Sequence, residues 1–229
     1  FYAFYVFKIC FIDNCYGEFV ETNEPIEIGA DLCAGSLIKN PGGGIAPTGG
    51  YVAGKSELVK QCSYRLTAPG LDKNCGPSLF SNRLIVQGLF YAPMIVGEAL
   101  KGAIFTSGIM EQMGFEVYPR YDEKRSDIVT AVILRDKDAL ISFCRGIQKV
   151  GPVDSHVMPE PWAMPGYDNK IIMAGGSFIQ GSSIELSADA PLREPYVVYI
   201  QGGLNFFHVK LGILSGLQTL IDSGNLKIK

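Results

Sequence analysis

The 229-residue sequence predicts a mixed α/β protein, in which short strands alternate with helices on either side of one long apolar helix. Hydrophobic residues make up 47% of the chain, which is enough to bury a sizeable core. Short apolar runs bounded by glycine, proline and aspartate alternate with segments of helical period. A long apolar stretch, residues 84–113, divides these segments into two groups. These three features together indicate the α/β class.

Charge and residue usage narrow the function classes. The net charge is −3 and no basic run occurs, so we expect no nucleic-acid partner. Six cysteines are scattered without a C-x-x-C pair, which favours reduced structural cysteines over zinc sites or disulfides. The chain has only two histidines, which makes a histidine-rich metal centre or a Ser-His-Asp triad a poor hypothesis. We therefore expect a cytoplasmic protein without a metal site.

The first predicted strand ends on a carboxylate. The apolar run Ile9–Ile12 leads directly to Asp13, which places this side chain at the carboxyl end of the strand. In open α/β sheets, ligands collect at that edge. A second apolar run, Leu32–Ala34, is followed by a small-residue turn and by Lys39. The next loop, Asn40–Gly44, is rich in glycine, and we expect it to let a ligand approach the backbone closely.

Lys39 lies between apolar Leu37-Ile38 and this glycine loop. Apolar surroundings desolvate a lysine and favour its neutral amine, which can attack a carbonyl carbon to form a Schiff base. The Asp13 carboxylate could hold a pyridine nitrogen protonated, which makes such a ring an electron sink. A lone lysine beside a glycine turn is more often a surface residue, so this hypothesis depends on the surrounding pattern.

The surrounding pattern resembles a known family. The order Asp13-Asn14, GADL, then Ser36-x-x-Lys39 resembles the pyridoxal-phosphate segment of fold-type-I enzymes of cysteine and methionine metabolism. GSLIKNPGGG, TGGY, YRLTAPG and FIQGSSIELSAD resemble the methionine gamma-lyase-like, or aluminium resistance, family of proposed carbon–sulfur lyases. The resemblance covers residues 9 to about 215. It implies part of a large cofactor domain in residues 1–83, a connecting helix in 84–113 and a small α/β domain in 114–229.

The resemblance also implies roles for individual residues. Lys39 matches the lysine that bonds covalently to pyridoxal phosphate, Asp13 the partner of the pyridine nitrogen, and Ser36 a contact of the cofactor phosphate. Many relatives have a second hydroxyl residue directly before the lysine, where this chain has Ile38.

Arg193 is the candidate for binding the substrate carboxylate. An arginine of the C-terminal domain forms a bidentate contact of this kind in the wider group. There it lies within a strand, whereas Arg193 precedes the strand predicted at Tyr196–Gln201. A surface arginine paired with Glu194 or Asp189 is an equal alternative.

A second motif points to a different chemistry. Gly49–Ser56 satisfies the P-loop formula G-x-x-x-x-G-K-[ST]. That loop requires a preceding strand, whereas here the supposed loop interior, Tyr51–Ala53, is itself typical of a strand. We expect a helix over Ser56–Leu66 and a solvated Lys55 in its first turn.

Residues 84–113 predict one long helix, with a possible kink at Pro93 and four glycines that would permit close packing. Glu98 and Lys101 lie in its middle, which favours burial in a soluble protein over a membrane span. After residue 114, the pattern predicts a smaller α/β region with antiparallel pairing. The predicted strands are 115–118, 128–134, 171–174, 178–179, 184–186 and 196–201, and the predicted helices are 137–149 and 205–223.

The resemblance implies a pyridoxal-phosphate enzyme that performs β- or γ-elimination on a sulfur-containing amino acid of the cystathionine or methionine type. It also implies a homodimer or homotetramer and no membrane partner. Relatives carry roughly another half before this point, so we expect the chain to be a fragment. The alternatives are a nucleotide-binding module that uses Gly49–Ser56, and a non-catalytic, degenerate relative.

Overall fold

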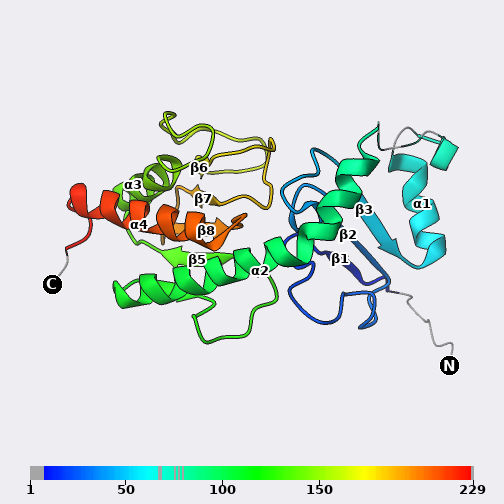
Figure 1. Cartoon of the computed structure of the whole chain (residues 1–229), viewed down its shortest axis with the longest axis horizontal. Coiled ribbons are helices and arrows are strands. Elements are labelled where there is room, and N and C mark those ends of the chain that lie inside the picture. The colour runs from blue at the N-terminus through cyan, green and yellow to red at the C-terminus, as the bar shows by residue number, and fades with distance from the viewer. Residues whose placement is uncertain (1–7, 67–68, 75, 77, 79, 228–229) are drawn as a thin grey trace, which may run out of the picture.

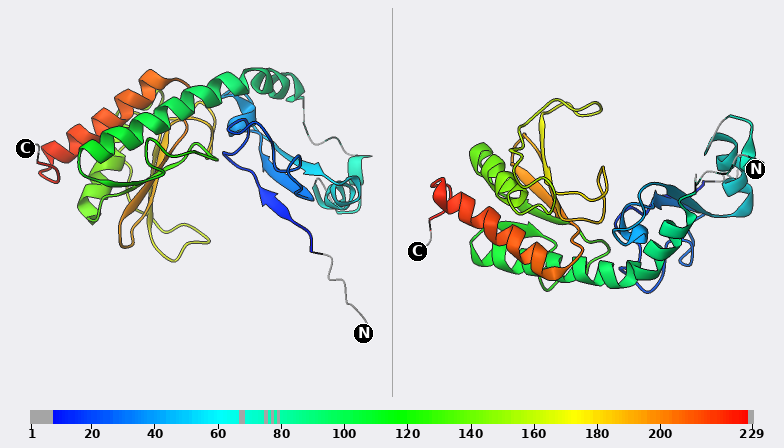
Figure 2. Two further views of the ribbon diagram at one scale, coloured as in Figure 1. Left: turned by 90° about the horizontal axis from the view of Figure 1, so that it is seen from below. Right: turned by 45° about the horizontal axis from the view of Figure 1, so that its top comes forward.

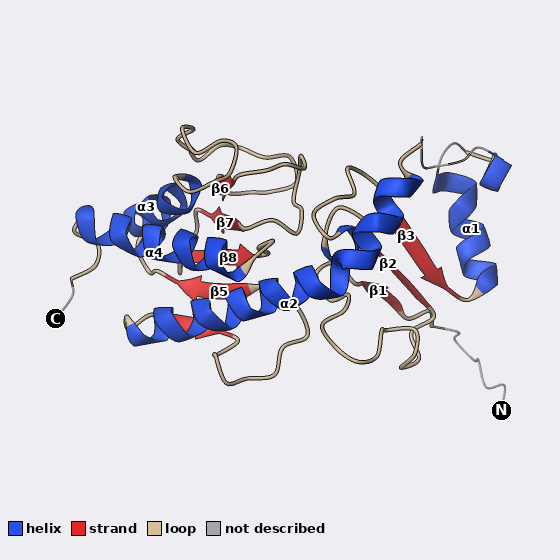
Figure 3. Cartoon of the chain, in the orientation of Figure 1, coloured by secondary structure: helices blue, strands red, loops and turns tan. Residues whose placement is uncertain are grey.

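The computed structural model describes residues 8–66, 69–74, 76, 78 and 80–227. Within them the chain forms two sheets with helices, which confirms the α/β class (Figure 1). The long helix α2 (Asn82–Gln112) runs along both groups of strands, as the colouring by secondary structure makes clear (Figure 3). The predicted division into domains at residues 83 and 113 stays a prediction.

The N-terminal sheet has the order β1 (Phe11–Asp13), β2 (Leu32–Ser36), β3 (Gly50–Gly54). Strands β1 and β2 are parallel, with Asp13 opposite Ala34, whereas β3 is antiparallel to β2. Because parallel strands end at the same edge, the residue that closes β1 and the residues that follow β2 meet there.

The sequence with the P-loop formula does not form a phosphate-binding loop. Gly50–Gly54 is the strand β3, whose backbone pairs with β2, and it leads directly into α1 (Ser56–Leu66) as predicted. Backbone groups that pair in a sheet cannot also surround a phosphate. Lys55, whose side chain is exposed, forms an ion pair with Asp31.

Helix α2 covers nearly the predicted range and continues through Pro93. Among the described residues it is the one helix that is long and apolar enough to cross a membrane, and only 22% of its most apolar window is buried. It is therefore less buried than the sequence predicts. Its middle packs against the C-terminal region, where Glu98 pairs with Lys101 and accepts a hydrogen bond from the Phe206 backbone.

The C-terminal sheet is antiparallel throughout, as predicted, with the order β4-β5-β8-β7-β6. Three helices, α3, α4 and the C-terminal part of α2, cover one of its faces (Figure 2). Asp136 and Asn205 cap these helices through their side-chain oxygens. The bounds are β4 Glu116–Tyr118, β5 Thr130–Ile133, α3 Lys137–Gln148, β6 Ile171–Gly175, β7 Ser187–Pro191, β8 Val197–Gln201 and α4 Phe206–Asp222.

Alternation along the strands separates the two faces of this sheet. Buried Ile172, Ala188, Val198 and Ile200 belong to the main hydrophobic core, which also contains residues of α3 and α4. The intervening side chains point to the opposite face, which no helix covers in the described residues. That face carries Met173, Asp189, Tyr199 and Gln201.

Two predicted strands, 178–179 and 184–186, are wrong. The Glu185 carboxylate accepts hydrogen bonds from the backbone N–H groups of Phe178 and Ile179, which folds this segment into a compact loop. The strand that the sequence failed to predict is β7. Its sequence, SADAP, has low strand propensity, but β7 pairs on both edges, with β6 and with β8.

Candidate active site

Three predicted site residues lie at one edge of the N-terminal sheet. Asp13 is the last residue of β1, Ser36 is the last residue of β2, and Lys39 directly precedes the short 3-10 helix η1 (Asn40–Gly42). The parallel pairing of β1 with β2 brings Asp13 and Lys39 to the same edge. The roles that the resemblance implies for these residues stay predictions.

Cys15 keeps Asp13 ionised. The Cys15 backbone N–H donates a hydrogen bond to Asp13 Oδ1 over 3.1 Å. Hydrogen bonds from the thiol and the backbone of Cys15 hold the pKa of Asp13 below its usual value, and the charge of Lys39 acts in the same direction. At neutral pH the site therefore presents an anionic carboxylate.

The Lys39 side chain lies against an aromatic ring. Its Nζ lies 4.5 Å from the centroid of the Tyr16 ring, a cation–π geometry. Among the described residues, no carboxylate lies within ion-pairing distance of Lys39. Its amine is thus positioned by a ring face and is not held in a salt bridge.

The glycines after Lys39 have a different role from the predicted one. A Cβ on Gly43 would lie 2.5 Å from the Gly88 carbonyl oxygen, and a Cβ on Gly88 would lie 2.2 Å from the Gly42 carbonyl oxygen. These distances show that the loop packs directly on the backbone of α2. The glycines therefore permit a close helix contact, and the expected ligand approach is wrong for Gly42 and Gly43.

Tyr16 connects this edge to the C-terminal sheet. Its hydroxyl accepts a hydrogen bond from Gln201 Nε2 over 2.9 Å and donates to the Ser183 carbonyl over 3.4 Å. Gln201 Nε2 also donates to Asp189 Oδ2 over 3.2 Å. Burial raises the pKa of Tyr16, so its hydroxyl stays protonated. Lys39, Tyr16, Gln201 and Asp189 thus form one continuous chain of contacts.

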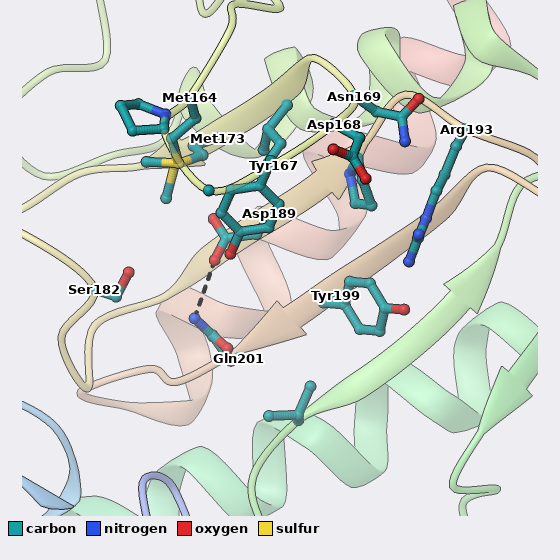
Figure 4. A pocket seen from close by; sticks show the side chains of 15 residues that line it. Met164, Tyr167, Asp168, Asn169, Met173, Ser182, Asp189, Arg193, Tyr199 and Gln201 are labelled. Atoms are coloured by element: carbon teal, nitrogen blue, oxygen red, sulfur yellow. Dashed lines mark hydrogen bonds between the residues drawn. The ribbon is translucent and has the colours of Figure 1, made fainter.

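The uncovered face of the C-terminal sheet forms the floor of an open pocket of about 800 Å³. Asp189, Tyr199 and Gln201 project into it from β7 and β8, as Figure 4 shows. The loop 164–169 borders it, and Arg193 lies toward the end away from Gln201 (Figure 4). Arg193 is exposed, and among the described residues it forms no ion pair with Glu194 or Asp189.

Sequence reasoning missed three residues of this arrangement. Tyr16 follows Asp13 closely, and its position beside the strand end was an available signal. Gln201 is a polar residue at a strand end before two glycines, which was a second signal. Asp189 was considered only as a possible ion-pair partner of Arg193, because the strand β7 that carries it has no recognisable pattern.

A family model described as methionine gamma-lyase matches residues 5–221. The chain belongs to the methionine gamma-lyase family. The protein YnbB of Bacillus subtilis (strain 168) is 53% identical over 214 residues, which are 93% of this chain and 51% of that protein. This membership confirms the family predicted from the sequence.

Two crystal structures are also similar to this chain of the methionine gamma-lyase family. A carbon–sulfur lyase involved in aluminum resistance, from Clostridium novyi NT, is 61% identical with a TM-score of 0.86, covering 93% of this chain and 50% of that one. A protein of Clostridium acetobutylicum, provisionally named a cystathionine beta-lyase involved in aluminum resistance, is 56% identical with a TM-score of 0.88, covering 93% of this chain and 49% of that one. The chain therefore spans about half the length of these relatives.

A more distant structure shows the fold alone. Cystathionine gamma synthase from Xanthomonas oryzae pv. oryzae is 14% identical with a TM-score of 0.56, covering 94% of this chain and 56% of that one. This likeness shows that a protein with little sequence similarity to this chain has a similar α/β fold.

Proposed function

We propose that the full-length protein, meaning this chain with any further segment that its gene encodes, is a pyridoxal-phosphate-dependent carbon–sulfur lyase. One observation carries the proposal: Asp13 and Lys39 lie at the carboxyl edge of the parallel strands β1 and β2. The chain would be the C-terminal portion of a fold-type-I enzyme. The names of the two clostridial relatives support carbon–sulfur cleavage.

The residues at this edge fit the cofactor. Lys39 has no ion-pair partner among the described residues, so its amine is available to the cofactor aldehyde. Asp13 stays anionic and suits the pyridine nitrogen, because the Cys15 hydrogen bonds hold its pKa low. The Ser36 hydroxyl, which accepts from the Ile38 N–H over 3.4 Å, suits a phosphate oxygen. When bound, pyridoxal phosphate supplies an electron sink for negative charge at the substrate α-carbon.

Side chains of this chain would remove the substrate proton, position the amine and bind the substrate carboxylate. Lys39 Nζ would remove the proton from the substrate α-carbon, because a lysine at the reacting centre can act as a general base. The Tyr16 ring limits the positions that this amine can take. Arg193, at the end of the pocket, would bind the substrate carboxylate through its planar guanidinium. β- or γ-elimination would then release the thiol of a sulfur-containing amino acid.

The assembly and location belong to the same proposal. We propose a homodimer or homotetramer in the cytoplasm, with a small amino-acid substrate and neither a membrane nor a nucleic acid as partner. The nucleotide-binding alternative has no structural support, because the P-loop sequence is a strand within a sheet. The non-catalytic alternative is tested together with the main proposal.

The decisive experiment is covalent trapping. The full-length protein is incubated with pyridoxal phosphate, reduced with borohydride and digested, and the modified lysine is identified by peptide mass spectrometry. Before reduction, we expect the protein to show the visible absorbance of a Schiff base between a lysine and pyridoxal phosphate. After reduction, we expect the label on Lys39, and Lys39→Ala should lose it.

Lys55→Ala is the matched control, because Lys55 is an exposed lysine of the same sheet region. This variant should retain the label on Lys39. A label spread over surface lysines, or no label at all, would overturn the cofactor assignment and favour the degenerate relative.

A further inference from the structure

The Glu185 carboxylate is buried, and the loop around it supplies its hydrogen bonds. Glu185 is 5% exposed, and among the described residues no lysine or arginine forms an ion pair with it. Its Oε1 accepts a hydrogen bond from the Phe178 N–H over 2.9 Å, and its Oε2 accepts from the Ile179 N–H over 3.1 Å and the Ser183 hydroxyl over 3.0 Å. A buried carboxylate costs free energy unless it is hydrogen-bonded, so these three donors hold the loop 178–185 around it.

This loop contacts the segment of Lys39 at two points. The Ile184 N–H donates a hydrogen bond to the Ile38 carbonyl over 3.2 Å, which fixes the backbone directly before Lys39. The Ser183 carbonyl accepts a hydrogen bond from the Tyr16 hydroxyl over 3.4 Å, and Lys39 Nζ lies over the Tyr16 ring. One point therefore holds the main chain of the lysine, and the other helps to orient the ring against which its amine lies.

The other side of the loop is fixed by the end of β8. The Gly203 N–H donates a hydrogen bond to the Ile184 carbonyl over 2.7 Å. A Cβ on Gly202 would lie 2.3 Å from the Glu185 carbonyl oxygen, so backbone packs directly on backbone here. Ser182, in the same loop, borders the pocket (Figure 4). The loop thus joins the C-terminal sheet and the pocket to the edge of the N-terminal sheet.

We propose that Glu185 is a positioning residue for the Lys39 amine. It holds the loop in the conformation that binds the Ile38 carbonyl and the Tyr16 hydroxyl, and so it fixes both the main chain and the ring that determine where Nζ lies. The consequence for catalysis rests on the proposed function, because a general base must lie within reach of the proton that it removes. The position of the amine does not depend on the cofactor and can be measured without it.

The ring current of Tyr16 provides a direct measurement of this position. Bound pyridoxal phosphate is removed from the full-length protein with hydroxylamine, and the lysines are reductively methylated with ¹³C-formaldehyde. The methyl signals of Lys39 are identified in NMR spectra by their absence in Lys39→Ala. Because Nζ lies 4.5 Å from the ring centroid, these signals should be displaced from those of exposed lysines such as Lys55.

Glu185→Gln places an amide donor where a carboxylate oxygen accepts hydrogen bonds, so the loop should lose its conformation. We expect the Lys39 signals to move to the position of exposed lysines. With pyridoxal phosphate restored and L-cystathionine as substrate, kcat should fall by about tenfold to a hundredfold at nearly constant KM. Glu57→Gln, at an exposed position of α1, is the matched control and should change neither measurement. Ser183→Ala removes one of the three donors and should move the Lys39 signals less.

Spectra are recorded where circular dichroism shows each variant to be folded, so that a general loss of stability does not move the signals. Lys39 signals that keep their wild-type position in Glu185→Gln would overturn the inference, even if kcat falls. If Glu185→Gln does not fold, Ser183→Ala decides in the same way. Wild-type Lys39 signals at the position of exposed lysines would also contradict the inference. Failure of the proposed function is distinguishable, because it would leave the Lys39 signals displaced and the borohydride label absent.

Discussion

The Gln201 side-chain amide donates a hydrogen bond of 2.9 Å to the hydroxyl of Tyr16, which lies 185 positions earlier in the chain. One residue belongs to the C-terminal sheet and the other follows the first strand of the N-terminal sheet. Since the Tyr16 ring contacts Lys39, the position of the proposed catalytic amine depends on a residue of the other sheet.

Gln201→Ala should therefore destabilise the protein. The substitution leaves the buried Tyr16 hydroxyl and the Asp189 carboxylate each without a donor, which costs about 1–3 kcal/mol of unfolding free energy. Urea denaturation measures the loss. Gln218→Ala is the matched control. Gln218 is exposed, and among the described residues its side chain bonds only to Asp222 on the same helix, so its effect should stay within about 0.5 kcal/mol. Equal effects of the two variants would contradict the bridging role.

The contact of the glycine loop with α2 gives a second prediction. Gly88→Ala places a Cβ 2.2 Å from the Gly42 carbonyl oxygen, so backbone must move, and we expect a loss of about 2–3 kcal/mol. Gly97→Ala in the same helix meets nothing within 4 Å and should gain about 0.5–1 kcal/mol from helix propensity. Urea midpoints of both variants test this. A neutral Gly88→Ala would show that the loop does not pack on α2 so closely.

The order of strands and helices was largely predictable, because the spacing of apolar residues along the sequence determines which segments form strands and which form helices. The helix at Ser56–Leu66 and the strands at Asp13, Leu32 and Tyr51 follow their apolar patterns. Strand β7 escaped prediction because its pairing on both edges, and no local preference, makes it a strand. The loop held by Glu185 escaped prediction for the converse reason: side-chain hydrogen bonds there outweigh strand propensity.

The candidate site was predictable only where its residues are close in sequence. The positions of Asp13 and Lys39 follow from one rule, that parallel strands end at a common edge. The bond from Gln201 to Tyr16 joins residues too far apart for any local pattern to indicate. The contact between Gly42 and Gly88 shows the same limit, because a glycine's role depends on which partner approaches it.

Glu18 should make stability depend on pH. It is 4% exposed, its Oε1 accepts from the Tyr51 hydroxyl over 2.8 Å, and burial raises its pKa above the ordinary value of 4.5. Above that ordinary value the unfolded chain releases the proton first, so the unfolding free energy falls as pH rises through the folded-state pKa.

Glu18→Gln keeps the acceptor and removes the titration. Its stability relative to wild type should therefore increase as pH rises above 4.5, as urea denaturation at a series of pH values would measure. Glu57→Gln, at an exposed position of α1, should show no such trend. A difference between Glu18→Gln and wild type that is constant with pH would contradict the burial argument.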